Sequence, residues 1–145
     1  QESVFLSDWP EPVALLDKRD RDDKWEGAHA VRSAVSRALE VARTAGIIGH
    51  SLDARVEVER TGVEDTARLF SDEDMKTFAI VSSFAWVDAL GDTKIRQTDE
   101  ELGIRVGVDH ARGEKCPRCW QYTEAPDERG LCPRCSAVLR DREER

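Results

Sequence analysis

The four cysteines of this chain, the only four among its 145 residues, form two identical C-P-R-C motifs. The first runs from Cys116 to Cys119 and the second from Cys132 to Cys135. A C-x-x-C turn places two sulfur atoms on one side of a metal ion, and a second such turn completes a tetrahedron of ligands. The proline after each first cysteine presets the φ angle that a tight turn requires. The spacing therefore predicts a zinc site.

Two other uses of the cysteines fit the sequence less well. A redox-active dithiol is typically a single C-x-x-C motif beside a β-α-β pattern, whereas this motif occurs twice in a short polar segment. Disulfides require an oxidising compartment, and the sequence shows no pattern of a secretory signal. Four thiolates fill the coordination shell of one ion and leave no position for water. We therefore expect one structural Zn²⁺ ion and no catalytic metal.

The composition indicates a small hydrophobic core and a soluble protein. Charged residues make up 36% of the chain and hydrophobic residues 39%, where about 25% charged is usual. The longest apolar run, Phe78 to Trp86, falls well short of the ~20 residues that cross a bilayer. We expect a cytoplasmic protein with no membrane contact. Its start at Gln1, without methionine, is consistent with a piece of a longer protein.

Charge is distributed unevenly along the chain. The formal net charge of −8 argues against a general nucleic-acid coat, because phosphate binding depends on Lys and Arg. From Arg112 onward, however, eight basic residues stand against seven acidic ones, while the upstream part has 14 against 23. Zinc with four thiolates carries a charge of about −2. Arg112, Lys115, Arg118 and Arg134 either offset this charge or contact phosphate, and the sequence leaves both interpretations open.

A long helix is predicted from Asp22 to Ala45. Apolar residues recur there at intervals of three and four, and Gly46 follows as the residue that ends the helix. The opposite face carries Arg37 and Arg43 among other polar residues. Such a face is by default exposed to solvent and only secondarily a surface for a polyanion.

The middle of the chain has the pattern of a small mixed structure. Alternation of apolar and charged residues predicts strands, and Ser71 with Asp74 matches a capping box that starts a helix. The expected elements are a strand at 55–59, a turn at Thr61–Gly62, a helix at 72–77, a strand at 78–87, a polar loop with weak helical content at 93–101 and a strand at 104–108. Together they predict an α+β fold with a long amino-terminal helix, a small mixed α/β middle subdomain and a carboxy-terminal four-cysteine zinc knuckle or ribbon.

No grouping of catalytic residues is evident. The three histidines, His29, His50 and His110, are scattered, and with four sulfurs available we interpret His110 as a surface residue. Neighbouring acids form solvated runs, and no glycine-rich phosphate loop is present. We expect the chain to perform no chemistry by itself.

Longer stretches of the sequence resemble a known family. Val108–Trp120 and Gly130–Cys135 look like the zinc-binding carboxy terminus of bacterial isoleucyl-tRNA synthetase. Further stretches that resemble the same family are Ser3–Pro10, Val35–Arg43 and Ile48–Ala54, while Glu64–Gly103 matches only in its hydrophobic outline. The short tail after Cys135 departs from the family pattern, so the last ten residues receive no role.

The resemblance implies a role for the chain. The family's catalytic domain, with its HIGH and KMSKS signatures, and its editing domain lie upstream, and neither signature is present here. Residues 1–50 would then be the last part of the helical anticodon-binding domain, 51–110 a connecting subdomain and 111–145 the zinc-binding module. The parent enzyme would use ATP, bound only in the absent catalytic domain, to attach isoleucine to its tRNA. This segment would grip the anticodon stem-loop.

The resemblance also implies which residues contact RNA. Trp120 matches the tryptophan expected to stack on an anticodon-loop base, an interaction worth about 1–3 kcal/mol. A ring packed over the zinc knuckle is the alternative. Arg118 and Arg134, each between paired cysteines, and Lys115 beside them are further candidates, as are Arg37 and Arg43 on the long helix. We expect a monomer that binds isoleucine tRNA and neither DNA nor a membrane.

Two other function classes remain open from the residues alone. Some DNA glycosylases of the formamidopyrimidine type carry a related four-cysteine finger, but their amino-terminal catalytic proline and helix-two-turn-helix region are not recognised here. The other class is a structural or protein-interaction module in which zinc orders the carboxy-terminal tail. Salt-sensitive binding to isoleucine tRNA, weakened by Trp120→Ala, separates the synthetase interpretation from this second class.

Overall fold

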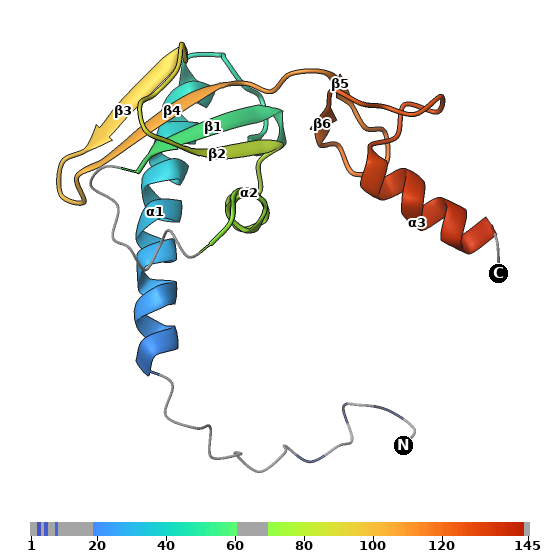
Figure 1. The fold of residues 1–145 in the computed structure, drawn as a ribbon, viewed down its shortest axis with the longest axis horizontal. Coiled ribbons are helices and arrows are strands. Elements are labelled where there is room, and N and C mark those ends of the chain that lie inside the picture. The colour runs from blue at the N-terminus through green and yellow to red at the C-terminus, as the bar shows by residue number, and fades with distance from the viewer. Residues whose placement is uncertain (1–2, 4, 6–7, 9–18, 61–69, 144–145) are drawn as a thin grey trace.

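The computed structural model describes residues 3, 5, 8, 19–60 and 70–143. Figure 1 shows a body of helices and a sheet, followed by a smaller carboxy-terminal module. Most of Ser3–Pro10 and the predicted turn at Thr61–Gly62 lie outside the described residues. In chain order the elements are α1 (Arg19–Thr44), η2 (Ser51–Asp53), β1 (Ala54–Glu59), α2 (Asp72–Ala79), β2 (Ser83–Val87), β3 (Ile95–Asp99), β4 (Ile104–His110), β5 (Glu114–Lys115), β6 (Tyr122–Thr123) and α3 (Pro133–Glu143).

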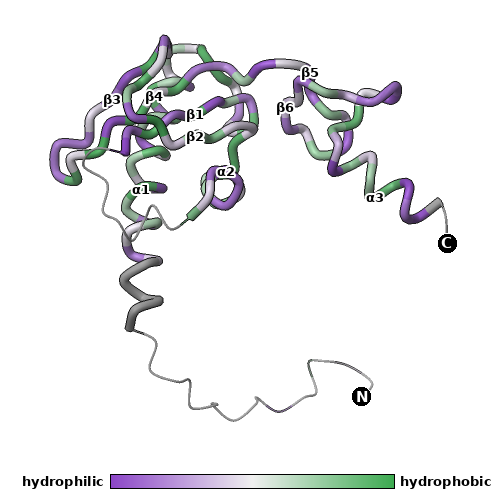
Figure 2. Tube along the Cα trace, in the orientation of Figure 1, coloured by the Kyte–Doolittle hydropathy of each residue, from purple (hydrophilic) through white to green (hydrophobic). Residues whose placement is uncertain are grey.

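Helix α1 confirms the predicted long helix. Figure 2 shows hydrophilic and hydrophobic residues alternating along the coloured part of the helix, as expected of a helix with one buried face. The helix ends in a left-handed turn at Gly46, where φ is +70°, and the amide of Ile47 donates to the carbonyl of Ala42 at 2.9 Å. A residue with a side chain is strained at this φ, so glycine ends the helix as predicted. The buried residues of α1 include Ala28, Val31, Ala34, Val35, Ala38, Leu39 and Ala42.

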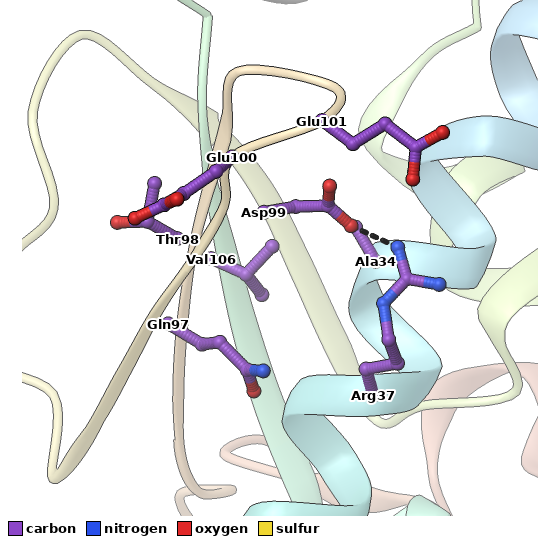
Figure 3. Close-up of a pocket in the computed structure, with 8 residues that line it drawn as sticks. All are labelled: Ala34, Arg37, Gln97, Thr98, Asp99, Glu100, Glu101 and Val106. Carbon is purple, nitrogen blue, oxygen red and sulfur yellow. Dashed lines mark hydrogen bonds and ion pairs between the residues drawn. The ribbon is translucent and has the colours of Figure 1, made fainter.

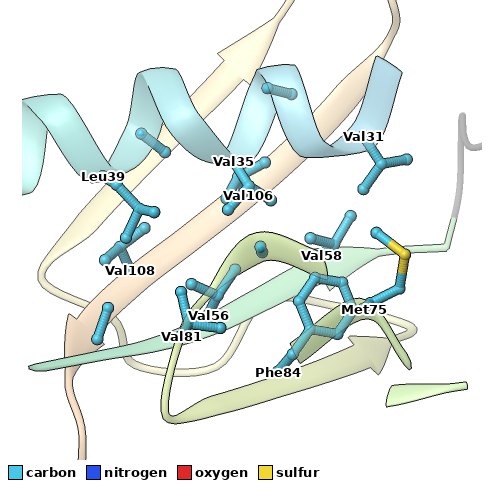
Figure 4. Close-up of a cluster of buried hydrophobic side chains, with 14 of the residues drawn as sticks. Val31, Val35, Leu39, Val56, Val58, Met75, Val81, Phe84, Val106 and Val108 are labelled. Carbon is cyan, nitrogen blue, oxygen red and sulfur yellow. The ribbon is translucent and has the colours of Figure 1, made fainter. Parts of the chain in front are cut away.

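Four strands form one sheet in the order β2-β1-β4-β3. β1 runs parallel to β2 and antiparallel to β4, and β3 is antiparallel to β4. A parallel pair needs a crossover connection, and α2 lies between β1 and β2 in the chain. Figure 4 shows α1 across one face of the sheet, where Val35 and Leu39 pack toward Val106 and Val108. The predicted α+β fold with its long amino-terminal helix is confirmed.

The other face of the sheet is polar, and the two glutamates at its centre are buried. The predicted strand at 55–59 is confirmed, yet its charged side is not exposed, since Glu57 and Glu59 are only 8% and 5% exposed. Glu57 forms an ion pair with Arg55 and accepts a hydrogen bond from the Gly91 amide at 2.8 Å. Arg105 donates to the carboxylate of Glu59 at 2.9 Å. Because each carboxylate is paired, its charge can be buried.

Helix α2 begins as predicted and ends later. The Ser71 hydroxyl accepts from the Asp74 amide at 3.1 Å and the Ser71 amide donates to the Asp74 carboxylate at 3.0 Å, which confirms the capping box. The helix continues to Ala79 and ends at Ile80, whose φ is +57°. The strand expected at 78–87 is therefore wrong in its first half, because those residues complete the helix and its cap.

The third strand was not predicted. The sequence indicated a loop at 93–101, whereas Ile95–Asp99 form β3. The strand lies at the edge of the sheet and is held by antiparallel pairing with β4. Strand formation of this kind depends on the partner more than on local sequence, so the polar composition was misleading. The strand expected at 104–108 is confirmed and extends to His110.

The carboxy-terminal module consists of the two-stranded ribbon β5–β6 and helix α3. The tail that received no role from the sequence forms most of α3. The buried hydrophobic residues of the module are three cysteines and Leu131, with Cys119 and Leu139 packed against them. This confirms the four-cysteine part of the predicted fold and shows how little apolar material surrounds it.

Helix α1 and the sheet share one hydrophobic core, which joins residues on both sides of position 50. The predicted division into 1–50, 51–110 and 111–145 stays a prediction. None of the helices in the described part of the chain combines the length and the apolar character that crossing a membrane requires.

Candidate metal centre

The four cysteines come together as their spacing predicts. Their Sγ atoms all lie within 4.8 Å of one another. The sulfurs of Cys119 and Cys132 are 3.6 Å apart, far beyond the ~2.05 Å bond of a disulfide. Thiolates at the ~2.3 Å zinc–sulfur distance form a tetrahedron with edges of about 3.8 Å. The donor set and its spacing therefore fit a tetrahedral Zn²⁺ ion held by Cys116, Cys119, Cys132 and Cys135, and His110 is not part of the cluster.

The first motif closes on a strained residue. The Trp120 amide donates to the Cys116 carbonyl at 2.8 Å, and the Cys116 amide donates to the Gln121 carbonyl at 2.9 Å. Trp120 itself has a φ of +66°. In this left-handed conformation the Cβ atom of an L-residue approaches the following carbonyl oxygen, at a cost of about 1–2 kcal/mol. The knuckle thus holds a tryptophan where glycine would fit without strain.

The second motif opens helix α3. Pro133 is the first residue of the helix, where the missing N–H of proline costs nothing. The Ser136 amide donates to the Cys132 carbonyl at 2.9 Å. Residues three apart lie on one side of a helix, so this turn brings Cys132 and Cys135 to the same side.

The buried cluster drives its thiols toward opposite ionisation states. Burial raises the pKa of Cys119 to about 12. Burial acts in the same direction on Cys116, but the backbone N–H groups of Cys132, Cys119 and Arg118 donate to its sulfur and lower its pKa to about 6. Thiols this close cannot all ionise alone, because each charge disfavours the next. Four thiolates at this spacing therefore need a cation such as Zn²⁺ to hold them ionised.

Arg118 lies against the clustered cysteine sulfurs. Its guanidinium donates to the Sγ atom of Cys135 at 3.4 Å, and this contact raises the pKa of Arg118. The contact supports the interpretation that Arg118 offsets thiolate charge. The side chain is nevertheless exposed, and a guanidinium carries five N–H donors, so further donors remain for a ligand.

The contacts that anchor the module to the body include an ion pair and a hydrogen bond. The Lys115 ammonium lies 3.1 Å from the carboxylate of Asp53 at the end of η2. The Tyr122 amide donates to the Ser82 hydroxyl at 2.7 Å. Burial acts to raise the pKa of Asp53, but the hydrogen bonds from Lys115 and the His50 backbone lower it below its usual value. These contacts fix the ribbon β5–β6 against the body.

A cavity of about 490 Å³ lies where the module meets the body. It is lined by Trp120, Pro117, Cys116 and Lys115 of the module and by His50 of the body. The Trp120 side chain is 61% exposed, so its ring is not a buried cover of the knuckle. An exposed aromatic face next to cationic side chains is a surface on which a nucleobase can stack.

Comparison with known proteins identifies the family. The chain is 38% identical to the isoleucine–tRNA ligase of Staphylococcus haemolyticus, over 97% of this chain and 15% of that protein. It is 40% identical to the isoleucine–tRNA ligase of Fervidobacterium nodosum, over 96% and 15% of the two chains. The enzyme of the same name from Desulfovibrio desulfuricans is 43% identical over 89% and 14%. The chain belongs to the isoleucyl-tRNA synthetase family.

The resemblance inferred from the sequence is confirmed, and the chain corresponds to a carboxy-terminal segment of these synthetases. It spans about 15% of the length of the curated relatives it matches. A scan against models of protein families finds no match.

The other RNA-contact candidates of this synthetase segment do not line the cavity. Arg134 is an exposed residue in the first turn of α3. Arg37 forms an ion pair with Asp99 of β3 beside a separate cavity of about 390 Å³, as Figure 3 shows. Arg43 forms an ion pair with Glu40 on the same helix. The carboxylate partners of Arg37 and Arg43 favour the interpretation of this helix face as a solvated one.

Two residues at the junction of this synthetase segment were not singled out from the sequence. His50 caps η2, since its Nδ1 atom accepts from the Leu52 amide at 3.2 Å, while Asp53 accepts from the His50 amide at 2.8 Å. An acceptor side chain followed three residues later by an acid is the spacing of a capping box. Histidine is an uncommon first residue of that box, which is why the pattern did not stand out.

Proposed function

We propose that this chain is the tRNA-binding carboxy-terminal part of an isoleucyl-tRNA synthetase, kept in shape by one structural Zn²⁺ ion. Upstream domains of the parent enzyme use ATP to attach isoleucine to its tRNA, while this part grips the anticodon stem-loop. The names of the relatives, isoleucine–tRNA ligases, support this assignment. The protein acts as a monomer in the cytoplasm.

Trp120 is the observation that carries the proposal. The residue combines a left-handed backbone with a side chain that is 61% exposed. Neither property helps the module to fold, because the strain is unfavourable and an exposed ring buries little apolar surface. Strained residues of this kind gather at functional sites, where a specific geometry is required. A ring presented in one orientation can receive an unpaired base at low entropic cost.

The metal has a structural task in this proposal. The module buries one non-cysteine apolar side chain, Leu131, which is too little to order it. Structural zinc contributes on the order of 10–16 kcal/mol in small peptides. The ion therefore supplies the order that presents Trp120 and the neighbouring cations.

The cations of the module supply the contact with RNA backbone. Arg118 and Arg134 are exposed, and Lys115 lines the cavity beside Trp120. The net charge of −8 of the whole chain disfavours binding of RNA, so binding depends on this local group of cations. We expect affinity for tRNA to fall steeply as salt increases.

The test uses the zinc-loaded parent enzyme and its isoleucine tRNA, with an unrelated tRNA for comparison. Trp120→Ala is expected to weaken binding of isoleucine tRNA by ~5- to 100-fold, the range of base stacking, and Trp120→Phe to retain most of it. Zinc content should be unchanged in both variants, because neither replaces a cysteine. If Trp120→Ala binds isoleucine tRNA as tightly as the original enzyme, the proposal is wrong.

A further inference from the structure

The zinc module does not form the proposed RNA site alone. We infer that the body completes it: His50 forms the second wall of a cleft that seats one unpaired nucleobase against Trp120, and donates a hydrogen bond to an acceptor atom of that base. This inference rests on the proposed function, because the occupant is a base of the bound RNA. It adds a specificity-determining residue that lies outside the zinc module.

The cleft is built from two distant stretches of the chain. His50 precedes η2, while Lys115, Pro117 and Trp120 belong to the ribbon and the first knuckle. The volume of about 490 Å³ falls among those of small-ligand pockets, which span roughly 300–1,000 Å³. The ion pair between Lys115 and Asp53 joins residues 62 positions apart and holds the two walls together.

The lining fits a base better than a cationic small molecule. Trp120 and Pro117 offer apolar faces, and His50 and Lys115 are the titratable side chains that line the cleft beside the buried sulfur of Cys116. No carboxylate lines it, so a cation finds no partner there. An aromatic face, a hydrogen-bond donor and one ammonium match a base, an acceptor atom on its edge and its phosphate.

The capping role of His50 fixes what its ring can offer. The Nδ1 atom accepts from the Leu52 amide at 3.2 Å, so it carries no proton. The proton of the neutral ring must then be on Nε2, which becomes a donor. The backbone amide of His50 is also held, by the Asp53 carboxylate at 2.8 Å. The donor is thus fixed before RNA arrives, and fixed donors discriminate among base edges better than mobile ones.

One substitution separates the two tasks of His50. His50→Ser keeps a side-chain oxygen that can cap η2, since serine is a favoured cap, but it removes the ring and its donor. His50→Ala removes both. Zinc content and thermal midpoint of the parent enzyme should therefore be unchanged in His50→Ser, and any loss of RNA binding then reports the missing ring.

The experiment measures binding of isoleucine tRNA transcripts to the zinc-loaded parent enzyme. We expect His50→Ser to weaken binding ~2- to 10-fold, the range of one neutral hydrogen bond. A set of transcripts, each with one unpaired anticodon-loop nucleotide made abasic, then locates the seated base. At that single position His50→Ser and the original enzyme should bind equally, because the base that His50 contacts is gone.

Each outcome separates this inference from the proposed function. If Trp120→Ala weakens binding but His50→Ser does not, the inference is wrong and the proposed function stands. A loss in His50→Ser that persists equally on every abasic transcript also overturns the inference, since the ring then contacts no base. If neither variant changes binding, the proposed function is wrong as well.

Discussion

The body and the four-cysteine module of this chain reach an ordered structure by different means. The body packs apolar side chains of α1, α2 and the four-stranded sheet into one cluster. The module buries Leu131 and three cysteines, and its ribbon has strands of two residues each. A chain segment this short cannot bury enough apolar surface to fold by packing alone. The two regions should therefore respond independently to loss of metal and to loss of packing.

Removal of the metal should have the largest effect and should be confined to the module. Because structural zinc supplies on the order of 10–16 kcal/mol, a strong chelator or Cys119→Ser should abolish ordered structure after Arg112. Helix α1 and the sheet should keep their protection, since no metal ligand lies in them. Hydrogen exchange measured by mass spectrometry reports both regions at once. Unchanged protection of residues 112–143 without metal would show that packing suffices there.

A cavity in the body should have the opposite pattern of effects. Leu39 is 5% exposed in the core of α1, and Leu39→Ala should destabilise the body by about 2–5 kcal/mol. Val41 lies two residues away and is 43% exposed, so Val41→Ala should change stability by less than about 0.5 kcal/mol. Urea unfolding followed by circular dichroism measures both values. Zinc content should stay constant in both variants, and a loss of zinc in Leu39→Ala would show that the regions are coupled.

The same contrast explains what the sequence could predict. The clustering of the four cysteines was predicted because each C-P-R-C motif is a local turn, and two such turns suffice to bring four sulfurs together. Helix α1 was predicted because its apolar stripe and Gly46 are also local signals. The fold class followed from these elements.

Features that depend on distant partners were missed. Strand β3 owes its structure to β4, and the burial of Glu57 depends on the Gly91 amide 34 residues later. The cavity beside Trp120 is lined in part by His50, which is distant from Trp120 in the sequence and is brought next to it by the fold. Local pattern carries no information on such contacts, so neither the second face of the sheet nor the wall formed by His50 could be predicted.

Backbone strain offers a matched test of the two regions. Among the residues that the structure describes, each region holds one non-glycine residue at positive φ, Ile80 in the body at +57° and Trp120 in the module at +66°. Ile80→Gly should stabilise the body, and Trp120→Gly the module, each by about 1 kcal/mol, because glycine adopts this conformation without strain. Urea unfolding measures the first, and the rate of zinc transfer to a chelator measures the second.

The two glycine variants should differ in RNA binding. Ile80→Gly should bind isoleucine tRNA like the original enzyme, whereas Trp120→Gly should bind more weakly while retaining zinc longer. A variant that is more stable and less active is the sign that strain is kept for function. Equal RNA binding by both variants would instead show that the strain of Trp120 is not kept for RNA binding.

The junction between the regions should give the smallest effect, and one that depends on pH. The folded-state pKa of Asp53 is lowered, so its carboxylate stabilises the junction above the unfolded pKa of about 3.9 and loses this contribution as pH falls through the folded value. Lys115 is 44% exposed, which limits the ion pair to about 0.5–1 kcal/mol. Asp53→Asn should therefore speed exchange of the Ala111 amide, which donates to the Asp53 carbonyl, at neutral pH.

Lys115→Met serves as the matched variant for this junction, because it removes the ammonium and leaves the carboxylate of Asp53 bonded to the amides of Gly49 and His50. It should speed Ala111 exchange less than Asp53→Asn does, since only one of the carboxylate's partners is lost. The difference between Asp53→Asn and the original protein should shrink as the carboxyl group becomes protonated. A difference that is constant with pH would show that the carboxylate charge does not hold the two regions together. The hydrogen bond from the Ala111 amide to the Asp53 carbonyl would then be the contact that joins them.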